Sequence, residues 1–111
     1  MKTTQSKIYR IKRWFKHFTQ RRVRGFDDSE TWNLDHNIAK FTLPRLKRFK
    51  DLNNGNPVDI TWEQWQNDLD DMIYAMENTI KLSDDCTYEC DFDRLNKGLI
   101  LFGKMFRDLW W

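Results

Sequence analysis

The sequence predicts an all-α fold, a small bundle of about four helices. Over several long stretches, apolar residues recur at spacings of three and four, the period of an amphipathic helix. Glycine and proline are scarce, with four and two residues in 111, and they fall between these stretches, where helices end. No stretch alternates polar and apolar residues as a half-buried strand does. We therefore expect a single helical domain over residues 1–111, long enough to bury a core.

The first predicted helix is basic and amphipathic. It spans about residues 7–24 of a basic N-terminal segment, residues 1–25, and ends at Gly25, a residue type suited to a helix C-cap. Its apolar stripe is expected to dock on the other helices, although helices of this kind also bind membrane surfaces. The stripe consists of Ile8, Ile11, Trp14, Phe15 and Phe18.

Charge is distributed unevenly along the chain. Residues 1–26 hold nine Lys and Arg and no acid, whereas residues 27–111 hold ten basic and seventeen acidic residues, a net charge of −7. The basic segment is expected either to dock on an acidic surface, of its own body or of a second subunit, or to bind nucleic acid by displacing condensed counterions. The candidate nucleic-acid contacts are Arg10, Lys12, Arg13, Lys16, Arg21 and Arg22.

The second helix is expected to begin within FDDSETW and to kink at Pro44. Asp27 or Asp28 can cap its N-terminus, and Glu30 lies where a capping box places its acidic residue. Pro44 lacks the backbone donor of a helical residue and clashes with the preceding turn, which predicts the kink. The turn signal NNGNP, residues 53–57, ends this segment.

The third and fourth helices follow. Thr61 and Gln64 predict a capping box, and Ile60 and Trp65 occupy the positions of a hydrophobic staple. Asp68, Asp70 and Asp71 have no partner histidine in the sequence and are expected to form a solvated acidic face.

The fourth helix is predicted near residues 92–110. It carries apolar residues at heptad spacing, namely Phe92, Leu95, Leu99, Phe102 and Phe106. Two terminal tryptophans, residues 110 and 111, rarely face water together, so we expect a dimer or a larger oligomer.

No pattern in the sequence points to catalysis or to a bound metal. Cys86 and Cys90 lie four residues apart, and neither histidine lies near them, so neither a disulfide framework nor a zinc site is expected. Glu-x-x-His pairs, phosphate-binding glycine loops and nucleophile motifs are missing. No apolar stretch approaches the ~20 residues of a membrane span. We expect a soluble protein of the cytoplasm with no enzymatic activity, catalytic residue, metal or cofactor.

The second helix carries the candidate ligand site. The planar fork of an arginine donates two hydrogen bonds to a phosphate at once, and a base or an adenine ring can stack on tryptophan. Against this, long basic side chains commonly cover apolar helix surface without any ligand, and a histidine at the edge of a core is commonly structural. The candidate residues are Trp32, His36, Lys40, Arg45, Arg48 and Arg107.

Three blocks of the sequence resemble, in order and in spacing, a group of short, uncharacterised proteins encoded by tailed bacteriophages. These blocks are RGFDDSETWNLDHNIAKFTLPRLKRFK, TWEQWQNDLDDMIYAM and GLILFGKMFRDLWW, and the resemblance covers approximately residues 24–81 and 95–111. It implies a phage-encoded accessory protein in the host cytoplasm. Small phage proteins of this kind often interfere with host defence or take over host machinery.

Three classes of function follow. The chain is expected to bind a host protein, a component of host defence or regulation, as a homo-oligomer. As alternatives, it sequesters a phosphorylated nucleotide between its helices, or it binds nucleic acid through the basic segment. The acidic body disfavours the nucleic-acid alternative, because DNA-binding domains are usually basic overall.

Overall fold

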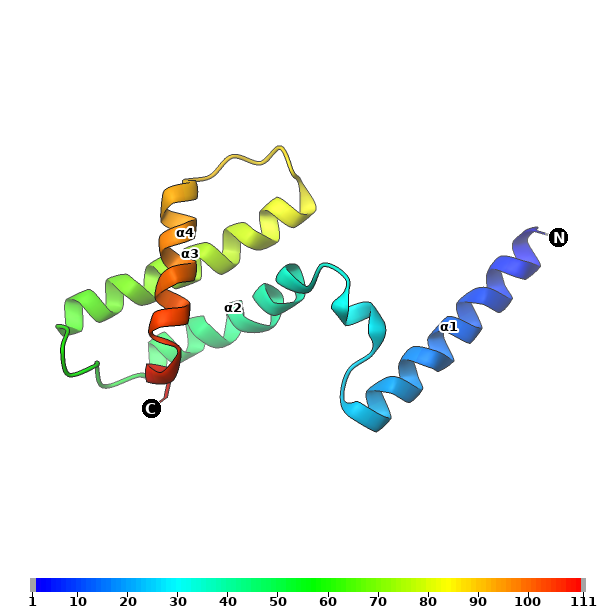
Figure 1. Ribbon diagram of the computed structural model, residues 1–111, viewed down its shortest axis with the longest axis horizontal. Coiled ribbons are helices and arrows are strands. Elements are labelled where there is room, and N and C mark those ends of the chain that lie inside the picture. The colour runs from blue at the N-terminus through cyan, green and yellow to red at the C-terminus, as the bar shows by residue number, and fades with distance from the viewer. Residues whose placement is uncertain (1, 111) are drawn as a thin grey trace. The chain divides into compact units, whose positions relative to one another are not determined.

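The computed structural model describes residues 2–110 of the chain, and the side chains from residue 7 onward (Figure 1). Within these residues there are four α-helices, two short 3-10 helices and no strand, which confirms the predicted all-α class. The chain divides into two compact units, Met1–Leu34 and Asp35–Trp111, called here the N-terminal and the C-terminal unit. Each is described by itself, and the single-domain organisation stays a prediction.

The N-terminal unit consists of helix α1 (Lys2–Arg24) and the 3-10 helix η1 (Asp28–Thr31). The predicted C-cap is confirmed, because Gly25 has a φ of +84° and its N–H donates to the carbonyl of Arg21 at 2.9 Å. A left-handed conformation of this kind is readily adopted only by residues such as glycine. The chain therefore turns sharply at the end of α1.

The predicted capping box at Asp27 and Glu30 is present, but it opens η1 and not the second α-helix. Helix α2 (Leu34–Leu52) begins only after Trp32, which is extended, and Asn33, which has a φ of +48°. Asparagine tolerates this left-handed conformation better than most side chains do. Two consecutive non-helical residues thus separate η1 from α2.

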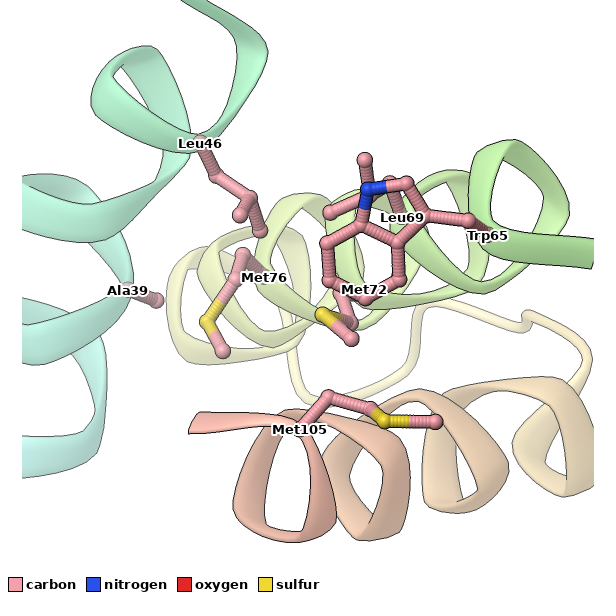
Figure 2. Close-up of a cluster of buried hydrophobic side chains, with 7 residues drawn as sticks. All are labelled: Ala39, Leu46, Trp65, Leu69, Met72, Met76 and Met105. Carbon is pink, nitrogen blue, oxygen red and sulfur yellow. The ribbon is translucent and has the colours of Figure 1, made fainter. Parts of the chain in front are cut away.

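The C-terminal unit is built from α2, α3 (Trp62–Asp84), α4 (Phe92–Lys104) and the 3-10 helix η2 (Phe106–Asp108). The Thr61–Gln64 capping box opens α3 as predicted, and Ile60 packs against the core. Figure 2 shows the buried cluster, which is formed by residues of α2, of α3 and of the segment after α4. Its members are Ala39 and Leu46 from α2, Trp65, Leu69, Met72 and Met76 from α3, and Met105 after α4.

Pro44 lies inside α2, which continues from Leu34 to Leu52. The guanidinium of Arg45 donates to the carbonyl of Phe41 at 2.8 Å and lies 3.7 Å from the centre of the Phe41 ring. Proline disturbs the backbone hydrogen bonds of the preceding turn. Arg45 therefore supplies a hydrogen bond to a carbonyl of that turn, a structural role for a residue that the sequence nominated as a ligand contact.

Helices α3 and α4 approach each other closely at Gly98, as their crossing in Figure 1 indicates. The expectation of a solvated acidic face was wrong for Asp71, whose side chain is 14 % exposed and pairs with Arg94 at 2.9 Å and with Lys97 at 3.3 Å. Asp70 pairs with Lys50 of α2 at 2.5 Å. Asp71 was misassigned because its partners lie on α4, whereas the Asp70 side chain is 44 % exposed, as expected of a solvated face.

Helix α4 is shorter than predicted, since it ends at Lys104 and η2 follows. The heptad residues also divide into two groups. Leu95 is buried and Phe102 packs against the core, whereas Phe92, Leu99 and Phe106 are exposed.

Candidate functional site

Helix α1 carries a row of large apolar side chains, called here the aromatic face. The side chains of this face are between 39 and 57 % exposed. Four of them follow one another at spacings of three, four and three, and they therefore share one side of the helix. The aromatic face consists of Ile8, Ile11, Trp14, Phe15 and Phe18.

The rings of the aromatic face contact one another. Trp14 stacks on Phe18 with ring centres 5.3 Å apart and planes 9° apart. It meets Phe15 edge-on at 5.0 Å. These contacts arrange the rings before any partner binds, which lowers the ordering cost of association.

The opposite, polar side of α1 is covered by Asp27 and Asp28, called here the acidic hook. The Asp27 side chain is 2 % exposed and accepts a hydrogen bond from Arg21 Nη1 at 2.6 Å. Asp28 accepts from Gln20 Nε2 at 2.6 Å, while its backbone N–H donates to Gln20 Oε1 at 2.7 Å. Arg24 Nη2 reaches Asp28 at 2.5 Å. The turn at the end of α1 thus folds back on the polar side and leaves the aromatic face uncovered within the N-terminal unit.

Hydrogen bonds in the hook favour its ionised carboxylates. The Ser29 hydroxyl and then Arg21 lower the pKa of Asp27, against the opposing effect of its burial. The Gln20 amide and then Arg24 lower the pKa of Asp28 from 3.8 to about 2. A carboxyl whose pKa is lowered in the folded state stabilises that state when the pH is above the ordinary pKa of the carboxyl. This stabilisation is lost as the pH falls through the lowered pKa.

We expect the hook to detach from α1 as the pH falls from 3.8 towards about 2. The Gln20 side-chain amide and Asp28 backbone amide signals should shift together in NMR spectra across this range. Asp28→Asn should remove the part of this pH-dependent signal change that results from protonation of Asp28. A midpoint close to 3.8 would contradict the lowered pKa of Asp28.

Trp32, a candidate ligand residue, belongs to the N-terminal unit. Its ring meets the His17 ring edge-on, with centres 6.1 Å apart, and the Arg13 guanidinium lies 4.7 Å from its centre. Both partners are residues of α1. Trp32 therefore helps to fasten the segment after α1 to that helix.

The six cations proposed for nucleic-acid binding have different environments. Lys16 and Arg21 pair with the acidic hook, at 3.5 and 2.6 Å. Arg22 lies 5.7 Å from the centre of the Phe18 ring, and Arg13 lies over Trp32 as described. Arg10 and Lys12 are exposed and form no ion pair with any residue whose side chain the structure describes.

The remaining candidate ligand residues belong to the C-terminal unit. Lys40, Arg45 and Arg48 are exposed and project from the side of α2 that faces away from Ala39 and Leu46. Arg107 is exposed within η2.

His36 is half-buried near the start of α2. Its Nδ1 atom is buried and has no hydrogen-bond partner among the described residues. The position agrees with a histidine at the edge of the core, which was the structural expectation for this residue.

A pocket of about 640 Å³ lies elsewhere in the C-terminal unit, between the loop of residues 53–60, Trp65 and the end of the chain. Its lining includes Lys104, Asp108 and Trp110, and none of the predicted ligand residues lines it. Two of the lining residues are hydrogen-bonded, since the Trp65 indole N–H donates to Asn53 Oδ1 at 2.9 Å. No sequence pattern indicates this pocket, because it depends on how the loop packs on the C-terminal segment.

Among residues 2–110 there is no cluster of three or more His, Cys, Asp or Glu side chains able to hold a metal ion. None of the helices described combines the length and the apolar character that crossing a bilayer requires. Comparison with known proteins gives no match to a protein family, to a curated protein or to a solved structure.

Proposed function

We propose that this chain is a binding protein that lays the aromatic face of α1 into an apolar groove of a partner protein. One observation carries the proposal. The acidic hook contacts the polar side of α1, and the five side chains of the aromatic face are 39 to 57 % exposed. An exposed aromatic surface of this extent is typical of an interaction site.

The spacing of the apolar residues fits recognition of a groove. Ile8, Ile11, Phe15 and Phe18 follow the pattern of anchors by which an amphipathic helix binds an apolar groove. Full burial of one such side chain contributes about 1.5–3 kcal/mol, and tryptophan is among the residues that most often dominate an interface. Burial of the remaining exposed area of five side chains supplies a substantial driving force for association.

Charge indicates the chemistry of the partner. Arg10 and Lys12 border the aromatic face, and Arg22 lies beside Phe18 at its C-terminal end. Cations around an apolar contact favour a groove with an acidic rim, since complementary charge speeds association and selects the partner. The hook neutralises Lys16 and Arg21, which leaves fewer cations for phosphate contacts and favours a protein over a nucleic acid.

The resemblance to short phage proteins gives this proposal its setting. A phage-encoded accessory protein would meet its partner in the host cytoplasm, and a component of host defence is the partner class that this setting favours. Binding alone is sufficient for such a role, so no catalytic residue is required.

Affinity capture from nuclease-treated host lysate tests the proposal. The wild-type chain should retain a defined host protein, and the double variant Trp14→Ala/Phe18→Ala should retain at least about tenfold less. Both side chains are exposed, so their removal should leave the fold unchanged by circular dichroism.

Tyr9→Ala is the matched control. Tyr9 is an aromatic residue of the same helix, 65 % exposed, and lies outside the aromatic face. Capture should be unchanged in this variant. Equal capture by the double variant and the wild type would contradict the proposal, as would binding that depends on nucleic acid.

A further inference from the structure

We infer that a second copy of this chain docks antiparallel on the outward side of α4. Three apolar residues of this helix and its extension, Phe92, Leu99 and Phe106, are 51, 44 and 61 % exposed. They are called here the outer row. They belong to the C-terminal unit and none is a residue of the aromatic face of α1, so the inference does not rest on the proposed function.

The outer row is one half of a heptad pattern. Its members lie seven residues apart, and the intervening Leu95 and Phe102 are directed to the core of the C-terminal unit. A row with this period is the surface that packs along another helix. The chain thus packs Leu95 and Phe102 into its own core, whereas the outer row is left exposed.

The outer row is symmetric about Leu99. In an antiparallel pair with its two-fold axis at this residue, Phe92 of each copy lies opposite Phe106 of the other, and the two Leu99 side chains meet. Ile100, which is 69 % exposed, lies next to the axis and adds apolar area there. One surface that complements itself in this way is the requirement for a two-fold dimer.

The charges beside the row identify the occupant as a second copy. Asp93 lies at the N-terminal end of α4, and Lys104 and Arg107 lie at the opposite end of the row. All three are exposed, and among the described residues none forms an ion pair within 4 Å, although the charge of Lys104 acts on Asp68 of α3. An antiparallel pair brings Asp93 of each copy near the two cations of the other, whereas a parallel pair would place like charges together.

Analytical ultracentrifugation of the full chain tests this inference. The 13.7 kDa chain should sediment as a dimer at micromolar concentration. Leu99→Glu should raise the dimer dissociation constant at least about tenfold, because it places two carboxylates at the two-fold axis. Val58→Glu, at a fully exposed apolar residue of the loop before α3, should leave the constant unchanged.

Exchange of the charges at Asp93 and Arg107 provides a second test, which does not depend on whether Leu99→Glu disturbs the fold. Asp93→Arg should weaken the dimer, and the double variant Asp93→Arg/Arg107→Asp should restore it, because each copy then again offers opposite charges to the other. A monomer at all concentrations would overturn the inference. So would a dimer that is insensitive to Leu99→Glu, or a double variant no stronger than Asp93→Arg alone.

Discussion

Replacing Gly98 by alanine is expected to destabilise the C-terminal unit by about 3 kcal/mol. A β-carbon at this position would lie 2.1 Å from the backbone oxygen of Asp71 and 2.7 Å from the Ala75 β-carbon. Neither atom can rotate away, because one belongs to the backbone of α3 and the other is the first atom of a short side chain. Helices α3 and α4 must therefore separate, although alanine itself favours a helix by about 1 kcal/mol over glycine.

Gly103→Ala is the matched control for this prediction. Gly103 lies in the same helix, but a β-carbon there meets no atom within 4 Å. The control should raise the free energy of unfolding by up to about 1 kcal/mol. Denaturant unfolding of dilute protein, followed by circular dichroism, measures both variants, and equal effects at the two glycines would contradict the close crossing of α3 and α4.

Replacing Trp65 by alanine should cost about 4 kcal/mol of folding free energy. The Trp65 side chain is 1 % exposed and lies among the core residues of Figure 2. It meets Phe49 edge-on at 6.4 Å, and its indole N–H donates to Asn53, which is 8 % exposed. The substitution removes a large buried volume and one buried hydrogen bond together.

Trp65→Phe separates these two contributions. It keeps most of the ring volume but leaves the Asn53 oxygen without its donor, which should cost about 1–3 kcal/mol. Trp62→Ala is the control on the same helix, because this tryptophan is 45 % exposed, and its removal should cost no more than about 1 kcal/mol. Similar losses of unfolding free energy at positions 62 and 65 would contradict the assignment of Trp65 to the core.

Local signals were sufficient to predict much of the fold. The capping boxes at Asp27 and at Thr61, and the glycine at the end of α1, involve residues within a few positions of one another, so they are readable in the sequence. The break between η1 and α2 was missed, because it depends on the left-handed conformation of Asn33, which most asparagines do not adopt.

Contacts between residues far apart in the sequence explain the predictions that were wrong or missing in α3 and α4. Asp71 looked like a solvated residue because Arg94 and Lys97, which cover it, are more than twenty positions away. The close approach of α3 at Gly98 was not predicted, since a glycine inside a helical pattern does not indicate which backbone lies against it.

Of the two faces of α1, the sequence predicted the apolar one but not the contacts on the polar one. The periodicity identified the apolar stripe, but the hook on the polar side depends on a sharp turn at Gly25 that returns Asp28 to Gln20. With this turn in place, the aromatic face is separated from the charges that hold the N-terminal unit together.

Site-specific photo-crosslinking in host cells tests the central claim most directly. A photoreactive phenylalanine at position 15, within the aromatic face, should form a discrete adduct with a host protein. The same probe at position 9, on the same helix but outside that face, should not. An adduct confined to the chain itself, equal adducts at both positions, or a product containing nucleic acid would contradict the claim that this face binds a partner protein.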